Sequence, residues 1–326
     1  MKKALVIGSN SFSGSHYINY LLKKNFIVIG VSRSSQNPKY YLPYNKNHKN
    51  FKFYKYAIGK NTNQILTLIK KYKINYVVNY GSQSMVAESW KNSEDWFLTN
   101  SYHISVLYKK ISELKIINKL VHISTPEVYG SNNKLLVENY SFNPNTPYAI
   151  SRTTADYYLR SLYKFDSFPF ITLRASNVYG ENQRLYRIIP KAIDYFHRKK
   201  KLPVHGKGSS MRSFIHIKDV CEATFVAMRK GKNGESFHVS TNEYITISNL
   251  LKLIAKIMKV DLSKYIKFTS DRKGKDGAYK LNSRKIRKLG WKNKIKLSHG
   301  IQKVINWYLG ERKNFKIKDY IYVHKK

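Results

Sequence analysis

Short apolar runs alternate with amphipathic stretches through the first half of the 326-residue chain, and this alternation is the strongest constraint on its fold. The apolar runs 4–8, 26–32, 75–81 and 119–125 each have the length of a strand. The stretches between them carry apolar residues at the spacing of a helix, as in 63–72. Strands that alternate with helices form a parallel sheet covered on both faces, so the pattern predicts an α/β fold.

Ligands of such sheets bind beyond the carboxyl ends of the strands, which meet at one edge. One more strand is predicted over 169–180, and helices are predicted over 218–231 and 247–258. The second half shows neither a repeat nor a linker, so any two domains must be interlocked. The residues that follow predicted strands should line one crevice; they are 8–14, 32–34, 81–84, 124–127 and 175–178.

The chain is strongly basic, with 60 lysine and arginine residues against 19 aspartate and glutamate residues and a net charge of +41. Such a surface attracts polyanions, which include nucleic acids, acidic membrane surfaces and phosphorylated substrates. Biased residue usage explains the many lysine, asparagine, isoleucine and tyrosine residues, but not the scarcity of acids. No recognition motif accompanies the charge, so we expect no specific nucleic-acid partner.

The sequence offers no sign of a membrane or secreted protein. No apolar stretch approaches the roughly 20 residues of a membrane helix, so we expect no membrane partner. The apolar run Ala4 to Ile7 is too short for a signal peptide. The single cysteine, Cys221, excludes an internal disulfide, and a cytoplasmic location is the simplest expectation.

A loop with two glycines follows the first predicted strand, in VIGSNSFSGSH (6–16). Dinucleotide-binding loops need glycine where the chain turns tightly and where the backbone meets a pyrophosphate, and Gly8 and Gly14 have this spacing. Ser11 stands where the middle glycine of the pattern is expected. The strand–loop–helix setting predicts a dinucleotide cofactor; the alternative is a tight turn without a ligand.

The end of the second strand bears on the choice of cofactor. An acid usually stands there to bind the ribose 2′-hydroxyl of NAD. This chain has Ser32, Arg33 and Ser34 instead, and a cation with hydroxyls suits a 2′-phosphate. We therefore predict NADP, with NAD as the alternative; Arg33 can equally be one more surface cation.

A tyrosine and an arginine stand four residues apart at the start of a predicted helix, in NPNTPYAISRTTADYYLRSLY (143–163). Tyr148 and Arg152 share one helix face, and a cation beside a phenol lowers the phenol's pKa. Tyr148 is therefore a candidate base for an alcohol proton. Ser124 or Thr125, at the end of a strand, could hold the same oxygen.

In this order along the chain, the motifs resemble the extended short-chain dehydrogenase/reductase family, in particular its nucleotide-sugar 4,6-dehydratases of the dTDP-glucose and GDP-mannose types. Matching stretches run from residue 4 to about 309. They are the phosphate loop, NYGSQSMVAESW (79–90), TN (99–100), STPEVYG (124–130), PYAISR (147–152), ASNVYG (175–180), LPVHGKGSSMRSFIHIKD (202–219), DRKGKDGAYKLNSRKIRKLGW (271–291) and GIQKVINWYL (300–309).

The resemblance implies a nicotinamide cofactor, a nucleotide-diphosphate hexose as substrate, and a set of site residues. Catalysis in the family uses a strand-end Ser or Thr, a Tyr, and a residue four positions later that is normally Lys. Here these are Ser124 or Thr125, Tyr148 and Arg152; arginine keeps the charge but presents a fork, so its ribose contacts must differ. The implied cofactor-binding residues are Gly8, Ser11, Phe12, Gly14, Ser32, Arg33, Ser34, Gly81, Asn100, Tyr148 and Arg152.

The substrate carries a diphosphate, so hydrogen-bond donors are expected in the second half of the chain. Asn177 and Arg212 match the family by motif position, whereas Arg187 and Arg272 are weaker candidates. No metal site is predicted. The substrate-binding candidates are Ser84, Asn177, Arg187, Arg212 and Arg272.

Glu127 distinguishes two reactions within the family. The resembling 4-epimerases have small residues at this position, because they only oxidise and reduce C4. A 4,6-dehydratase must also remove the C5 proton, and Glu127 is placed for that step. The dTDP-glucose enzymes have an acid one residue earlier, where this chain has Pro126; the GDP-mannose enzymes also lack that acid. Protonated Glu127 could itself donate to the leaving hydroxyl.

The sequence thus predicts a Rossmann-like doubly wound parallel sheet over 1–175 and a smaller α/β substrate domain over 176–326. The predicted enzyme is a nucleotide-sugar 4,6-dehydratase that makes a 4-keto-6-deoxy sugar nucleotide. A 4-epimerase is the nearest alternative, and a silent dinucleotide-binding protein that holds polyanions is an alternative of another class. A homodimer is expected from helices near 101–116 and 148–164. The base and the hexose stay open among dTDP, GDP, UDP and CDP sugars.

Overall fold

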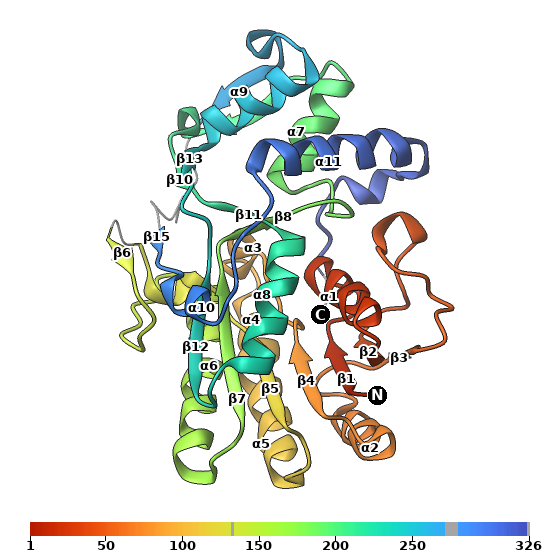
Figure 1. Cartoon of the computed structure of the whole chain (residues 1–326). Helices are drawn as coiled ribbons and strands as arrows, with labels where there is room; N and C mark the ends of the chain where they lie inside the picture. The colour runs from red at the N-terminus through yellow and green to blue at the C-terminus, as the bar shows by residue number, and fades with distance from the viewer. Residues whose placement is uncertain (132–133, 271–279, 325–326) are drawn as a thin grey trace.

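A seven-stranded parallel sheet forms the centre of the chain (Figure 1). The structure is a computed structural model that describes residues 1–131, 134–270 and 280–324. All neighbouring strands of the sheet are parallel, as the alternation of strands and helices predicted. The strands lie in the order β12 (Glu235–Val239), β7 (Phe170–Ala175), β5 (Lys119–Ile123), β4 (Tyr76–Asn79), β1 (Lys3–Ile7), β2 (Ile27–Ser32) and β3 (Phe51–Lys55).

Helices cover both faces of this sheet because successive side chains of a strand point to opposite faces. On β1, Ala4 and Val6 pack into one apolar layer and Leu5 and Ile7 into the other. The first layer is closed by α1 (Phe12–Lys23), α8 (Ile217–Lys230) and α10 (Arg284–Lys288). The second is closed by α2 (Thr62–Tyr72), α5 (Ile104–Leu114) and α6 (Pro147–Asp166).

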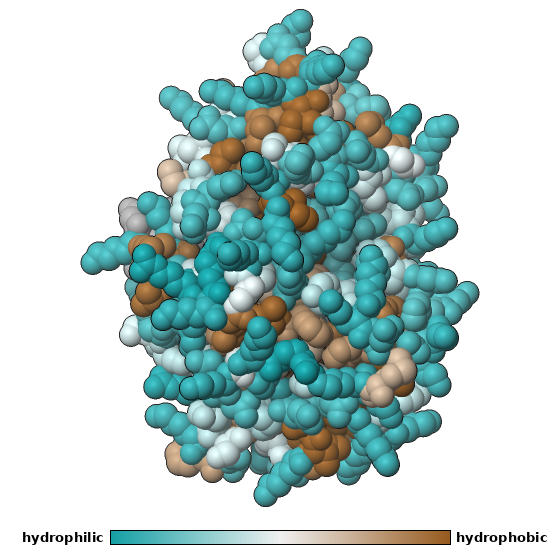
Figure 2. All heavy atoms as spheres, viewed as in Figure 1, coloured by the Kyte–Doolittle hydropathy of each residue, from teal (hydrophilic) through white to brown (hydrophobic). Residues whose placement is uncertain are grey.

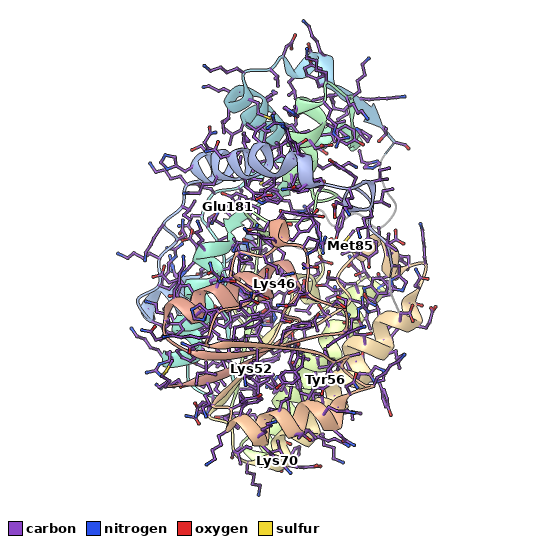
Figure 3. The ribbon with its side chains drawn as sticks, turned by 90° about the vertical axis from the view of Figure 1, so that its right-hand side faces the viewer. Lys46, Lys52, Tyr56, Lys70, Met85 and Glu181 are labelled. Atoms are coloured by element: carbon purple, nitrogen blue, oxygen red, sulfur yellow. The ribbon has the colours of Figure 1, made fainter. Side chains whose placement is uncertain are left out.

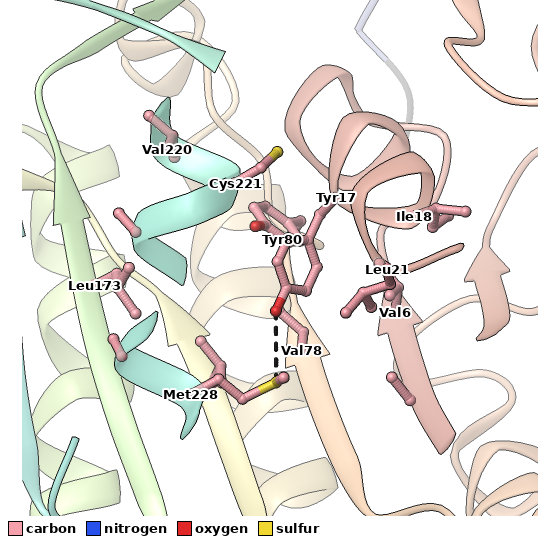
Figure 4. Packing of buried hydrophobic residues seen from close by; sticks show 14 of the residues in the cluster. Val6, Tyr17, Ile18, Leu21, Val78, Tyr80, Leu173, Val220, Cys221 and Met228 are labelled. Carbon is pink, nitrogen blue, oxygen red and sulfur yellow. Dashed lines mark hydrogen bonds between the residues drawn. The ribbon is translucent and has the colours of Figure 1, made fainter. Parts of the chain in front are cut away.

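The contact between α1 and α8 joins the two halves of the chain (Figure 4). Tyr17 of α1 is fully buried, and its hydroxyl donates a hydrogen bond to Met228 Sδ of α8 at 3.5 Å. Cys221 lies in the same layer, where burial raises the pKa of its thiol. Because α8 packs on the first sheet, the second half of the chain is anchored to the first.

A second apolar core lies above the sheet in Figure 1, in the part of the chain predicted to bind the substrate, which we call the substrate region. Its helices are α7 (Ile188–His197), α9 (Ile247–Met258) and α11 (Leu297–Glu311). Four short strand pairs lie outside the seven-stranded sheet: β8 (Asn177–Tyr179) with β11 (Phe214–His216), β9 (Leu202–His205) with β14 (Ile266–Thr269), β10 (Met211–Arg212) with β13 (Ile245–Thr246), and β6 (Leu135–Leu136) with β15 (Lys280–Leu281), among the described residues.

Three of the differences between the structure and the predicted elements concern strands. The strand predicted over 169–180 is two strands, because the chain leaves the sheet after β7 and β8 pairs with β11 instead. β3 escapes prediction because its lysines interrupt the apolar pattern of an edge strand. β12 lies beyond residue 175 in the sequence, yet it extends the first sheet. The domain division at residue 175 stays a prediction.

Hydrophilic side chains cover most of the face seen in Figure 2. From the side, Met85 and Glu181 lie at the level where the sheet meets the substrate region, while Lys52 of β3 and Lys70 of α2 lie lower (Figure 3). Within the described residues, no helix has both the length and the apolar character that crossing a membrane requires.

Candidate active site

A cavity of about 890 Å³ opens at the carboxyl ends of the sheet strands, between the sheet and the substrate region. Residues from all five predicted strand-end stretches line it, as the parallel sheet predicted. Twelve of the predicted site residues are among them: Ser11, Phe12, Arg33, Ser84, Ser124, Thr125, Glu127, Tyr148, Arg152, Asn177, Arg187 and Arg212.

The glycine loop brings the N-terminus of α1 to this cavity. Gly8 has a positive φ of 77°, and a Cβ there would lie 2.5 Å from the amide nitrogen of Gly81. A Cβ on Gly14 would lie 2.3 Å from the carbonyl oxygen of Gly8. Ser11 caps the helix, and its Oγ accepts a hydrogen bond from Gly14 N at 3.0 Å. Gly8, Gly14 and Gly81 thus permit close packing of the backbone behind the cavity wall. The N-terminus of α1 fits a pyrophosphate.

The end of β2 lies beside the same loop. Asn10 Nδ2 donates hydrogen bonds to the carbonyl oxygen of Ser34 at 2.8 Å and to Ser34 Oγ at 3.2 Å. Arg33 lines the cavity at an exposed position, whereas Ser32 ends the strand behind it. Asn10 lies within the predicted stretch 8–14 but was not among the predicted cofactor-binding residues.

Asn100 supports the wall of the cavity from behind. It is fully buried in the π-helix η2 (Phe97–His103). Its Oδ1 accepts a hydrogen bond from Gln83 N at 2.9 Å, and its Nδ2 donates to Gln83 O at 3.0 Å. Asn100 therefore fixes the loop after β4, and Gln83 itself lines the cavity.

Thr125, Glu127 and Tyr148 meet on the cavity wall. Thr125 caps the 3₁₀ turn η3 (Pro126–Tyr129), and its Oγ1 accepts a hydrogen bond from Glu127 N at 3.2 Å. Tyr148 lies in the first turn of α6 and is hydrogen-bonded to the Thr125 side chain. Two strand-end residues and one helix-start residue are thus brought to one place by β5 and α6.

The predicted lowering of the Tyr148 pKa is wrong for this structure. Burial raises the pKa of the phenol overall, and Glu127 raises it further. Arg152, the hydrogen bond with Thr125 and Arg187 each oppose this rise. The effect of Arg152 has the predicted direction, but desolvation of a buried phenolate outweighs it.

Arg152 is buried, with 2% of its surface exposed, and only part of its guanidinium is engaged. Its Nη2 donates to the carbonyl oxygen of Ile123 and lies 3.3 Å from His122 Nε2. Nε and Nη1 have no hydrogen-bond partner among the residues that the structure describes. A buried cation with open donors on a cavity wall fits the ribose of a dinucleotide.

Ser124 is held by a buried charge pair that the sequence did not reveal as part of the site. Its Oγ donates to Asp156 Oδ2 at 2.7 Å, and Arg174 Nη2 lies 2.8 Å from the same oxygen. His122 Nε2 lies 3.5 Å from the other oxygen of Asp156. The signal was available, because Asp156 follows Arg152 by one helix turn and Arg174 interrupts an apolar strand.

The substrate region closes the opposite side of the cavity. Asn177 begins β8, Arg187 precedes α7, and Arg212 ends β10. Arg272 lies outside the described residues. Tyr186 and Tyr322 also line the cavity and were not predicted, because neither belongs to a family motif or to a periodic pattern.

Three comparisons place these features among known proteins. The family described as GDP-mannose 4,6 dehydratase matches residues 5–304. The human dTDP-D-glucose 4,6-dehydratase is 31% identical, over 96% of this chain and 91% of that protein. Two solved structures also resemble the chain, each with a TM-score of 0.86 and 27% identity: dTDP-glucose 4,6-dehydratase from Bacillus anthracis in complex with NAD, and UDP-glucose 4-epimerase from Thermotoga maritima with UDP-glucose.

The matches extend over the whole fold and not over one motif. The Bacillus structure covers 96% of this chain and 98% of its own, and the Thermotoga structure covers 96% and 99%. The family match includes every described residue of the cavity wall except Tyr322 and Val323. The chain therefore belongs to the nucleotide-sugar 4,6-dehydratase family of the short-chain dehydrogenase/reductases.

Proposed function

We propose that the chain converts a nucleotide-diphosphate hexose into its 4-keto-6-deoxy derivative, with Thr125, Glu127 and Tyr148 as catalytic residues. The observation that carries this proposal is that all three side chains line one cavity at the N-terminus of α1. A nicotinamide dinucleotide supplies, when bound, the hydride acceptor for C4 and the hydride donor for C6. The open donors of Arg152 and the close glycine packing support such a cofactor.

Tyr148 acts first: in its phenolate form it is the base that accepts the proton of the C4 hydroxyl. Because burial raises the pKa of this phenol, the phenolate depends on the opposing effects of Arg152, Thr125 and Arg187. Thr125, already hydrogen-bonded to the phenol, holds the same substrate oxygen. Arg152 favours the phenolate by charge and offers its free nitrogens to the ribose. Ser124 is less suited to hold the substrate oxygen, because its hydroxyl already donates a hydrogen bond to Asp156.

Glu127 acts in the second half of the reaction. Oxidation at C4 makes the C5 proton acidic, and the carboxylate of Glu127 removes it. The hydroxyl at C6 must then leave with a proton, which Pro126 cannot supply. Glu127, protonated by the C5 proton that it has removed, delivers a proton to this hydroxyl, so one carboxyl group serves both transfers. Hydride return to C6 then leaves an enolate, which takes up a proton from solvent at C5 to give the 4-keto-6-deoxy product.

The substrate diphosphate lies on the opposite wall in this proposal, near Asn177, Arg187 and Arg212. Guanidinium groups bind phosphate oxygens in a bidentate geometry, which supports this placement of the diphosphate. The base and the hexose stay open. The domain division at residue 175 and the cytoplasmic location also stay predictions.

Replacing Glu127 with glutamine tests the reaction directly. We expect Glu127→Gln to lose water elimination by about 10²-fold or more, because the amide cannot accept the C5 proton. Mass spectrometry of dTDP-, GDP-, UDP- and CDP-hexoses, incubated with NAD or NADP, would show loss of one water by the wild type alone. Exchange of the C5 proton in heavy water should also disappear. A wild-type enzyme that only interconverts C4 epimers would show that the epimerase alternative is right and that Glu127 is idle.

Substitutions of Arg152 test whether this arginine has the role of the lysine that the family usually has at this position. We expect Arg152→Met to weaken dinucleotide binding and turnover by about 10-fold or more, because the charge and its open donors are lost. Arg152→Lys should retain most of the activity. The matched control is Arg160→Met in the same helix, since that guanidinium lies 4.4 Å from the Tyr140 ring and does not line the cavity. Normal cofactor affinity in Arg152→Met would contradict the assignment.

The predicted preference for NADP rests on Arg33. The Bacillus neighbour is a complex with NAD, which weighs against the prediction. Partial desolvation lowers the pKa of Arg33. Tyr322 and Asp95 act in the opposite direction, which indicates that both groups lie near the guanidinium. If the prediction is right, Arg33→Ala weakens NADP binding by about 10-fold and leaves NAD binding nearly unchanged, because only the 2′-phosphate needs the cation. Calorimetric titration with both dinucleotides measures this, and equal losses would refute it.

We also propose that the chain forms a homodimer through η2 and α6. Apolar side chains on these elements are exposed: Leu98 by 48%, Tyr102 by 62% and Ile150 by 42%. A groove lined by Phe97, Leu98 and Tyr102, among others, runs along the same face. A monomer rarely leaves such side chains together in water, which supports a second copy as the partner.

Light scattering after size-exclusion chromatography tests this dimer. We expect Tyr102→Glu to be monomeric, because burying an unpaired carboxylate at the centre of the contact is unfavourable. Phe165→Glu is the control, since Phe165 is 84% exposed at the far end of α6. A Tyr102→Glu protein with the mass of a dimer would exclude this face as the contact.

A further inference from the structure

The segment that follows α11 crosses from the substrate region to the sheet. We call its residues 317–324 the strap; the segment begins with η7 (Ile317–Asp319). In Figure 1 the chain descends from α11 toward α1. The family match ends at residue 304, before the strap begins.

The first part of the strap is fixed by Asp319. This carboxylate is buried, and its Oδ2 accepts hydrogen bonds from Lys316 N at 2.8 Å and from the hydroxyl of Tyr40 at 3.1 Å. Arg184 Nη1 lies 3.6 Å from Oδ1. The ring of Tyr320 lies 4.4 Å from the guanidinium of Arg198. These contacts join the strap to both parts of the fold.

The far part of the strap is anchored on the sheet side. His324 Nε2 lies 2.6 Å from Asp95 Oδ2, and its ring stacks on Trp96 with centroids 5.1 Å apart and an interplanar angle of 19°. Asp95 and Trp96 belong to the short helix α4 (Ser93–Trp96). A hydrogen bond and a ring stack on neighbouring residues hold one histidine in a defined place.

Tyr322 lies between these two anchors and faces the cavity. It lines the cavity together with Val323, Arg33 and Tyr186. Its ring meets Tyr186 edge to face, with centroids 5.6 Å apart, and its phenol lies near the guanidinium of Arg33. Arg33 follows β2, where the ribose of the adenosine half of a dinucleotide binds in sheets of this kind.

We propose that Tyr322 is part of the cofactor site and that the strap closes the cavity over the adenosine half of the dinucleotide. Tyr322 contributes an aromatic wall, and His324 acts as a positioning residue that keeps it there. The inference rests on the proposed function only in that the cavity must hold a dinucleotide. Release of that dinucleotide requires the strap to move, so its exchange is slow.

Binding of ADP-ribose and of nicotinamide mononucleotide tests the strap without any turnover. We expect Tyr322→Ala to weaken the binding of ADP-ribose by about 10-fold, because of the two fragments only ADP-ribose contains the adenosine half. Affinity for nicotinamide mononucleotide should not change. Ile321→Ala is the matched control, since that side chain is 59% exposed and does not line the cavity.

Stopped-flow release of NADH tests the anchor. We expect His324→Ala to raise the dissociation rate constant of NADH by about 10-fold, since most changes in affinity act on dissociation. His324→Phe should restore part of the slow release by keeping the stack on Trp96. A chain that ends at Tyr320 should release NADH at least as fast as His324→Ala.

The outcomes separate the two proposals. The role of the strap would be overturned if the wild type and Tyr322→Ala bound ADP-ribose with equal affinity. It would also be overturned if the wild type and the shortened chain released NADH at equal rates. Neither result would contradict the proposed dehydratase activity. A wild type that binds neither ADP-ribose nor NADH would overturn the strap together with the cofactor assignment. Tighter ADP-ribose binding after removal of the strap would also overturn this proposal, because the strap would then occupy the ligand's place.

Discussion

The buried carboxylate of Asp156 is the interaction on which the active site depends. It lies inside α6 with no exposed surface, and it binds Arg174 of β7 and the hydroxyl of Ser124 after β5. One side chain thus ties a helix to two neighbouring strands. Removing one partner of such a buried pair costs about 3–5 kcal/mol, because the other charge stays buried without compensation. The position of Arg152, one turn earlier on α6, is fixed by the same contact.

The scarcity of acids in this chain gives each buried carboxylate a large structural role. Asp219 accepts hydrogen bonds from the backbone nitrogens of Lys294 and Ile295 at 3.0 and 3.1 Å, and so ties α8 to the segment before α11. Burial alone would raise the pKa of Glu181, but His216 and Lys218 lower it overall. Each carboxylate joins segments far apart in the sequence. The excess of cations is left at the surface, where it is solvated.

The sequence was sufficient for five of the seven sheet strands and for the strand-end residues of the cavity wall, because both follow from local patterns. Apolar runs of strand length define the sheet, and the residues after them must meet at one edge. The contributions of β12 and Tyr322 could not be predicted in this way. Each lies far along the chain from its partners, and no local period marks a strand that joins a distant edge or a segment that crosses a cavity.

The Tyr148 pKa shows a second limit of local reasoning. Helix spacing correctly places Arg152 beside the phenol, and its charge acts in the predicted direction. Spacing says nothing about burial, which is a property of the whole fold and which dominates here. The phenol therefore depends on the sum of its neighbours, Thr125 and Arg187 among them, and not on one cation.

In the proposed reaction, Arg152 takes the place of the family's usual lysine because the site divides the work of its guanidinium. One nitrogen, Nη2, is held by the carbonyl of Ile123 and lies beside His122. Burial lowers the pKa of His122 to about 3, so its ring stays neutral and can accept a hydrogen bond from the cation. Nε and Nη1 are buried and have no hydrogen-bond partner among the described residues. A lysine has one ammonium group for both tasks, whereas the fork of an arginine anchors itself and still presents donors to a ligand.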